Sequence, residues 1–197
     1  QGVSGRNAIF SAIAAGVLCL SIPALAAPTN TYYVDAANGS PQSPFDTWAK
    51  AATNIQTAVD KASDDLVPGT TQCVVLVTNG TYTVTSEISI TTGITLRGFS
   101  GNWEDTIIKG GYPASTNRCL TINNALALVD GFTITNGYLD VDQGAGVYVD
   151  SAGGTLQNCL VTGNRARGGS TPGTGAGVYV VGAGGIVQNC TIRNNTS

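Results

Sequence analysis

Hydrophobic and polar residues alternate with a period of two along most of this 197-residue chain. Short runs rich in Val, Ile, Thr and Tyr are separated by Gly, Asn and Asp. Such alternation predicts β-strands that bury every second side chain. The pattern covers residues 31–34, 74–77, 82–84, 88–90, 94–96, 107–108 and 120–122. The sequence therefore predicts an all-β protein built from short strands.

Two segments in the C-terminal third, 144–164 and 175–195, are nearly identical and are offset by 31 residues. Self-similarity at such a period is typical of solenoids. Each segment contains three strand-like runs separated by breaks rich in Gly and Asn, which accept the positive φ of tight corners. We interpret each repeat as one coil of a parallel β-solenoid, with roughly four coils in the chain.

A weaker copy of the repeat at residues 129–137 allows the inward side chains to be aligned. Stacked coils would place aligned residues in ladders along the axis. The three predicted ladders are Phe132, Cys159 and Cys190; Ile134, Val161 and Ile192; and Val129, Leu156 and Val187. The offset is 27 residues for the first step and 31 for the second. The four extra residues fall in one loop, which can bulge from a corner without disturbing the stack.

One segment near the N-terminus changes to helical periodicity. We expect one apolar helix face formed by Trp48, Ala51, Ala52, Ile55, Ala58, Val59 and Ala62. Asp46 fits as N-cap and is spaced to pair with Lys50. Such a helix would cover the first coil, so residues 27–72 are expected to form a strand and capping helix before a solenoid of residues 73–197. No similar cap is evident near Ser197, which predicts an N-terminal fragment of a longer protein.

Residues 1–26 have the order of a secretory signal peptide. Arg6 precedes an apolar run at 8–22, followed by Pro23 and the small-residue motif at 24–26. We expect cleavage after Ala26 and a secreted or cell-surface protein. The alternative is a membrane anchor, which the short run and Pro23 disfavour.

Composition excludes several classes of function. The formal net charge is −3, and Lys and Arg form no cluster, so we expect no nucleic-acid partner. The chain contains no His, which excludes a Ser-His-Asp triad and any His-ligated zinc site.

Four cysteines follow the signal segment: Cys73, Cys119, Cys159 and Cys190. Neighbouring coils would lie about 4.8 Å apart, which is within the Cα range of a disulfide. Two arrangements are consistent with the sequence: a disulfide bridge between Cys159 and Cys190, or a ladder of buried thiols. The ladder is favoured because side chains in parallel register point the same way.

The residues also carry family resemblances. The segments at 32–62, 73–84 and 88–98 resemble the start of pectin-lyase-like right-handed parallel β-helix proteins, where a cap helix leads into V-x-x-G-x-Y and G-I-T-L-x-G. Residues 159–180 resemble the repeats of bacterial polymorphic outer-membrane proteins and autotransporter passengers. These resemblances imply a right-handed β-helix, and the second implies a C-terminal outer-membrane barrel as the means of membrane contact. The superfamily also contains enzymes, so fold alone does not assign function.

We expect an exported passenger with a structural or adhesive role and no cofactor. Its partner would be a cell-surface or extracellular polysaccharide or a host surface. Outward Tyr148 and Tyr179 occupy matching positions and would serve as sugar platforms, although such ladders also simply stabilise sheets.

The alternative is a carbohydrate-active enzyme, a polysaccharide lyase or glycoside hydrolase acting on a pectin-like polysaccharide. The lyase resemblance implies acidic residues that hold Ca²⁺ and a basic residue that takes a proton. The candidate catalytic residues are Asp140, Asp142, Asp150, Arg165 and Arg167. These residues fit equally well as a surface ion-pair group across two coils.

Overall fold

The computed structural model describes residues 29–140, 143–167 and 175–197. The predicted signal segment therefore lies outside the described residues. The helical elements are η1 (Trp48–Lys50) and α1 (Ile55–Asp64). The first nine strands are β1 (Thr29–Val34), β2 (Gln72–Val77), β3 (Gly80–Val84), β4 (Ile88–Ile90), β5 (Thr95–Gly98), β6 (Thr106–Gly110), β7 (Leu120–Ile122), β8 (Leu128–Asp130) and β9 (Thr133–Thr135). The others are β10 (Tyr138–Leu139), β11 (Val147–Val149), β12 (Gly154–Gln157), β13 (Leu160–Thr162), β14 (Arg165–Ala166), β15 (Val178–Val180), β16 (Gly185–Gln188) and β17 (Thr191–Arg193).

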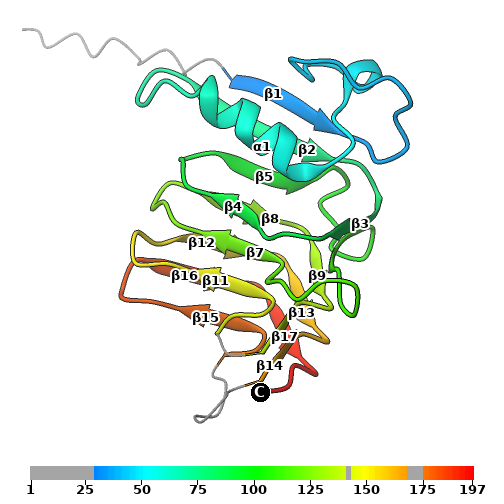
Figure 1. The fold of residues 1–197 in the computed structure, drawn as a ribbon. Helices are drawn as coiled ribbons and strands as arrows, with labels where there is room; N and C mark the ends of the chain where they lie inside the picture. The colour runs from blue at the N-terminus through cyan, green and yellow to red at the C-terminus, as the bar shows by residue number, and fades with distance from the viewer. Residues whose placement is uncertain (1–28, 141–142, 168–174) are drawn as a thin grey trace, which may run out of the picture.

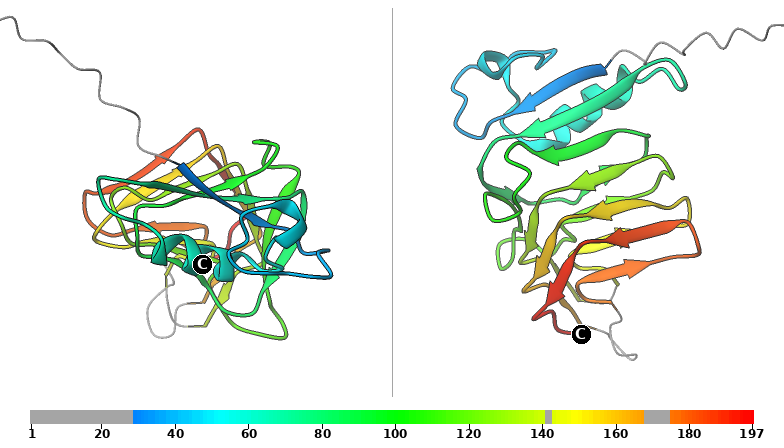
Figure 2. Two further views of the ribbon diagram at one scale, coloured as in Figure 1. Left: turned by 90° about the horizontal axis from the view of Figure 1, so that it is seen from above. Right: turned by 180° about the vertical axis from the view of Figure 1, so that it is seen from behind.

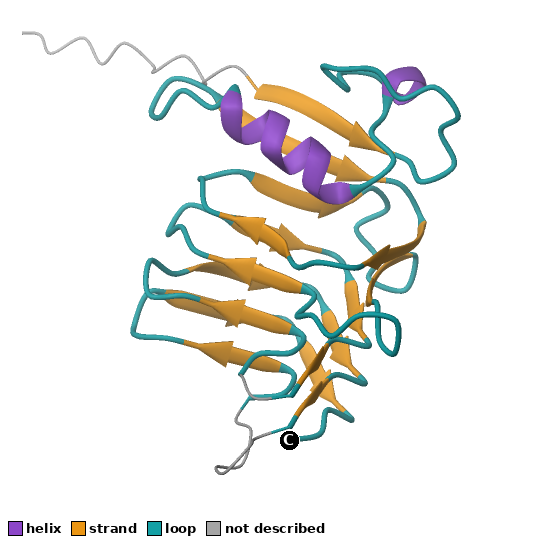
Figure 3. Cartoon of the chain, in the orientation of Figure 1, coloured by secondary structure: helices purple, strands orange, loops and turns teal. Residues whose placement is uncertain are grey.

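The strands form parallel sheets (Figures 1 and 3). Sheet A has the order β1-β2-β5-β8-β12-β16, sheet B β17-β13-β9-β6-β3, sheet C β15-β11-β7-β4, and the small sheet D β10-β14. From β2 onward, the chain passes from sheet A to sheet B to sheet C and then returns to sheet A. We call each such passage a circuit. The prediction of a mostly β protein is confirmed, and the parallel sheets are compatible with a solenoid-like arrangement (Figure 2).

The pairing register follows the sequence repeat. β11 pairs with β15 so that Tyr148 lies opposite Tyr179, and β13 pairs with β17 so that Val161 lies opposite Ile192. The earlier step pairs Ile134 with Val161 at the shorter offset. The longer connection lies between β14 and β15, and its residues 168–174 are outside the described part of the chain. The loop is therefore longer in the later repeat, while the strands on either side of it keep their register.

The core lies between the sheets. The first two members of each predicted ladder, such as Val129 and Leu156, are fully buried. The last members are more open, since Val187 is 37% exposed and Ile192 49% exposed. The reason is that β16 and β17 each pair with a single strand, whereas β12 and β13 lie between two.

The prediction of one helix beginning near Trp48 is wrong. Residues 48–50 form only a short 3-10 helix, and α1 begins at Ile55. Between them, Ala52 forms a parallel bridge with Val34, and this extended pairing ends the helical geometry.

Asp46 is not the N-cap of α1. Asn54 takes this role, because its Oδ1 accepts a hydrogen bond from the Thr57 backbone N–H at 2.8 Å. The predicted partner of Asp46 is nevertheless present, with Lys50 Nζ 3.2 Å from Asp46 Oδ1.

α1 packs at the end of the stack near β1 and β2 (Figure 1). Its buried face consists of Ile55, Ala58, Val59 and Ala62. These residues join the same core cluster as the strands, so α1 covers apolar surface that the first circuit would otherwise expose to water.

Candidate functional site

The outward side of sheet C carries a row of polar and aromatic side chains that we call the tyrosine face. Strand register aligns Ser89, Thr121, Tyr148 and Tyr179 across four neighbouring strands. The neighbours Val147 and Val149 are fully buried, so strand alternation directs Tyr148 outward. The rings of Tyr148 and Tyr179 stack with centroids 5.8 Å apart and an interplanar angle of 17°. The structure therefore places the two predicted tyrosines together.

Arg118 contacts Tyr148 from the preceding circuit. Its Cζ lies 4.6 Å from the centroid of the Tyr148 ring, within cation–π range. Nη1 donates to Glu87 Oε2 at 2.9 Å, and Nε donates to the Gly144 carbonyl at 3.1 Å. Glu87 Oε2 also accepts from Thr121 Oγ1 at 3.0 Å. The tyrosine face thus continues into an oriented ion pair, which fixes the guanidinium against one side of the stack.

A second aromatic stack lies at the corner between sheets B and C. Tyr112 and Tyr138 have centroids 4.1 Å apart at 16°, and Arg165 Cζ lies 6.0 Å from the Tyr138 centroid. Arg167 Nη1 donates to Tyr138 Oη at 3.3 Å. The hydrogen bond to Tyr138 is the main cause that raises the pKa of Arg167. Tyr112 is 42% exposed, so this stack also offers a ring to solvent.

The structure separates Asp150 from the two arginines of the predicted catalytic group. Asp150 follows β11, where the chain turns from sheet C to sheet A, and its Oδ1 accepts from the Ser151 backbone N–H at 2.6 Å. Arg165 lies in β14, at the corner between sheets B and C. The interpretation that Asp150 faces Arg165 across two coils is therefore wrong, because the two residues occupy different corners of the circuit.

The other members of that group are exposed or lie outside the described residues. Asp140 is exposed, and its charge contributes to the raised pKa of Arg167. Among the described residues, no ion pair joins Asp140 or Asp150 to either arginine. Asp142 lies outside the described residues. In the described ranges, no group of three or more Cys, Asp or Glu residues is arranged to hold a metal ion.

Asp130 forms a polar cluster on the outer side of sheet A. Its Oδ2 accepts from Arg97 Nε at 2.9 Å, and its Oδ1 accepts from Asn158 Nδ2 at 2.7 Å. The Asp130 side chain is 9% exposed, whereas that of Arg97 is 44% exposed. These contacts make Asp130 a hydrogen-bond acceptor for two neighbouring side chains. Both carboxylate oxygens are engaged, which leaves the group poorly placed for proton transfer.

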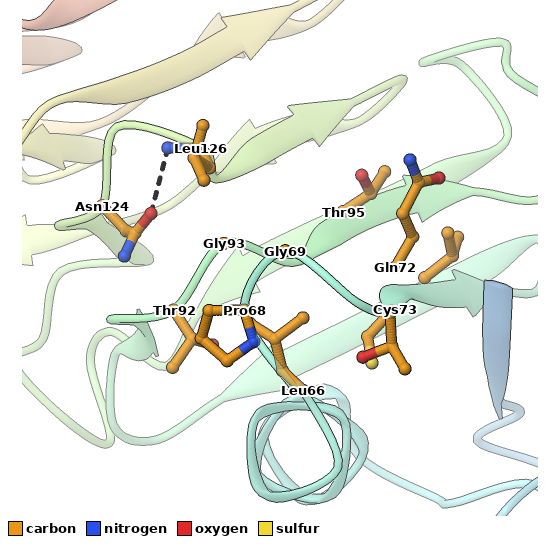
Figure 4. Close-up of a pocket in the computed structure, with 12 residues that line it drawn as sticks. Leu66, Pro68, Gly69, Gln72, Cys73, Thr92, Gly93, Thr95, Asn124 and Leu126 are labelled. Carbon is orange, nitrogen blue, oxygen red and sulfur yellow. Dashed lines mark hydrogen bonds between the residues drawn. The ribbon is translucent and has the colours of Figure 1, made fainter. Parts of the chain in front are cut away.

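A groove of about 590 Å³ lies between the loop that follows α1 and two corners of the stack. Figure 4 shows Leu66, Pro68 and Gly69 on one side and Asn124 and Leu126 on the other. The groove is lined by Leu66, Pro68, Gly69, Thr71, Gln72, Cys73, Val74, Thr92, Gly93, Thr95, Asn124 and Leu126. None of these lining residues is a carboxylate or a cation, and burial is the main cause that raises the pKa of the Cys73 thiol. The groove therefore offers shape and hydroxyl groups but no acid or base for catalysis.

Sequence reasoning found the two tyrosines of sheet C but missed their charged neighbours and the second stack. Arg118 lies in a segment that shows no clear copy of the repeat, so no alignment linked it to Tyr148. Tyr138 and Arg165 are offset by the same 27 residues as the first ladder step, and this offset could have placed them side by side.

Comparison with protein-family models, with curated proteins and with solved structures found no match to this chain. Within the part of the chain that the structure describes, no helix has the length and apolar character needed to cross a membrane.

Proposed function

We propose that this chain is an exported surface passenger with an adhesive role, and that the tyrosine face binds a cell-surface or extracellular polysaccharide. The observation that carries this proposal is the stack of Tyr148 and Tyr179 on the outward side of sheet C, extended by Arg118. Stacked aromatic rings with an apolar face and a hydroxyl group suit sugar rings, which present C–H groups on one face and hydroxyls at the edge.

The proposal includes a finer description of the fold. The chain would be a right-handed parallel β-helix of the pectin-lyase-like kind, resembling polymorphic outer-membrane protein repeats. Two observations support this description of the fold. The chain passes in order from sheet A to sheet B to sheet C, and successive circuits pair in register. Successive circuits would repeat the same outward positions about every 4.8 Å, which suits a linear polymer lying along the stack.

The adhesive role is preferred to catalysis because of where the charged groups lie. A hydrolase needs two carboxylates facing one bond, and a lyase needs a base beside a cation that stabilises the substrate. Asp150 is separated from Arg165 and Arg167, and Asp130 is engaged by Arg97 and Asn158. The tyrosine face, in contrast, supports a binding role because it needs no catalytic acid or base.

The proposal predicts that removal of the outermost ring weakens binding. Affinity electrophoresis against a panel of cell-surface and plant polysaccharides would identify a ligand and compare variants of the chain. We expect Tyr179→Ala to weaken binding by about two- to tenfold, since a stacked aromatic ring contributes about 0.5–1.5 kcal/mol. The matched control is Thr155→Ala on the outward side of sheet A, which should bind as the wild type does.

The same preparation tests the enzyme alternative. The chain would be incubated with polygalacturonate, with and without Ca²⁺, and unsaturated product would be measured. Our account expects no product. Activity that disappears in Asp142→Ala or Arg165→Ala would replace the adhesive proposal with a lyase.

A further inference from the structure

Cys159 and Cys190 lie on neighbouring strands at equivalent positions. β13 and β17 pair so that Leu160 lies opposite Thr191, and each cysteine directly precedes its strand. The Thr191 backbone N–H donates to the Cys159 carbonyl at 2.9 Å, which continues the ladder to the cysteines themselves. The 31-residue repeat therefore brings two thiols, distant in sequence, to adjacent levels of the stack.

The two thiols lie at matching register positions but differ in exposure. Both are free, and each donates to a backbone carbonyl, Cys159 Sγ to Gln157 at 3.0 Å and Cys190 Sγ to Gln188 at 3.2 Å. Cys159 is 1% exposed, whereas Cys190 is only partly buried because β17 has a single neighbouring strand. A reagent in solution can thus reach Cys190, while Cys159 lies directly behind it.

We propose that Cys159 and Cys190 form a redox pair that closes into a disulfide between two circuits by exchange with a low-molecular-weight disulfide. Adjacent strands lie about 4.8 Å apart, inside the Cα separation of about 4.4–6.8 Å that a disulfide spans. In-register side chains start out parallel, so closure requires one of them to turn toward the other. Cys190 is the residue placed to make this movement, because it is only partly buried, whereas Cys159 is buried.

The order of the two steps follows from the environments. The neighbouring Cys159 side chain is the main cause that lowers the pKa of Cys190, and Cys190, together with burial, raises the pKa of Cys159. The Cys190 thiolate attacks one sulfur of the small disulfide RSSR, forming a mixed disulfide and releasing RS⁻. Cys159 then loses its proton and attacks the Cys190 sulfur, which releases a second RS⁻. Both leaving thiolates take up a proton, so two protein thiols are oxidised and RSSR is reduced to two RSH.

The closed bridge would fasten the least protected circuit to its neighbour. Val187 and Ile192 belong to that circuit and are partly open to water. A bond from Cys190 to the buried Cys159 limits the separation of β17 from β13. An exported protein meets disulfide-forming conditions, so this inference agrees with the proposed export but does not depend on sugar binding.

Cys73 and Cys119 provide internal controls. Both are buried, and burial is the main cause that raises their thiol pKa values, that of Cys119 to about 12. Cys119 Sγ donates to the Thr135 carbonyl at 3.3 Å and has no cysteine at the matching position of the next circuit, since β7 pairs with β4 and β11. Neither thiol is placed to form a bridge.

The test treats the full chain with oxidised glutathione and maps the products by mass spectrometry after cleavage at Asp and Arg. We expect one linked pair of peptides, residues 150–165 joined to 168–193, in the wild type and in Cys119→Ser. Cys190→Ser should give no such pair. Absence of the linked pair, a glutathione adduct on Cys190 without closure, or a bridge to Cys73 or Cys119 would overturn the proposal.

A second measurement on the same samples tests whether the disulfide holds β17 to β13. Hydrogen exchange of residues 186–193 should slow in the oxidised wild type and return to its original rate after dithiothreitol. Cys190→Ser should show no change with oxidant. Unchanged exchange in a bridged wild type would refute the proposal that the bond holds β17 to β13.

Discussion

At the scale of single residues, the corners between strands depend on buried polar groups and on close backbone contacts. Asn164 is almost fully buried, and its Oδ1 accepts from the Gly137 N–H at 2.9 Å. Its Nδ2 donates to the Ile134 carbonyl at 3.0 Å and to Asn195 Oδ1 at 3.0 Å. A Cβ on Gly137 would lie only 1.9 Å from the Ala145 carbonyl oxygen, so only glycine fits there.

We predict that Asn164→Leu destabilises the fold. Leucine has a similar size but removes the side-chain acceptor of the Gly137 N–H, and a buried group left unpaired costs about 1–3 kcal/mol. Denaturant unfolding would measure the loss of free energy. Asn30→Ala, at an exposed position at the start of β1, should change stability by less than about 0.5 kcal/mol. Equal stability of the two variants would refute this role of Asn164.

At the scale of elements, α1 is attached to the first circuit by polar contacts as well as by its apolar face. Asp65, the residue after α1, accepts from Lys61 Nζ at 2.6 Å and from Tyr32 Oη at 2.7 Å. The hydrogen bond from Lys61 is the main cause that lowers the pKa of Asp65, and the hydrogen bond from Tyr32 lowers it further. Tyr32 belongs to β1, so the carboxylate links the helix end to sheet A.

The lowered pKa of Asp65 predicts a dependence of stability on pH. A carboxyl whose pKa is lower in the folded state stabilises the fold above its unfolded pKa of about 3.9, and the contribution is lost as pH falls through the folded pKa. Lys61→Met should therefore lower Tm at neutral pH, and its difference from the wild type should shrink below about pH 4. Lys50→Met, which removes an exposed pair, should have little effect at any pH. A difference that stays constant from pH 7 to pH 3 would contradict the assignment.

At the scale of the whole molecule, the sequence repeat determines which residues become neighbours. The offset from Tyr148 to Tyr179 predicted their pairing, because successive circuits are held in register by the backbone ladder. The start of α1 was not predictable from periodicity alone, since the pairing of Ala52 with Val34 depends on a strand 18 residues earlier.

The sequence predicted only part of the candidate site. Outward tyrosines follow from alternation, but the position of Arg118 depends on the path of a corner that has no repeat to align. The position of Asp150 was misread because β11 separates it from the loop that precedes Val147 and carries it to the next corner of the circuit.

The central claim is that a polysaccharide binds across Tyr148 and Tyr179. The most direct test is NMR of the ring signals of the chain's seven tyrosines while a polysaccharide that binds is added. The account predicts that the signals of Tyr148 and Tyr179 move together with a common affinity, while those of the buried Tyr32 and Tyr82 stay fixed. Binding that leaves both Tyr148 and Tyr179 unshifted would contradict it.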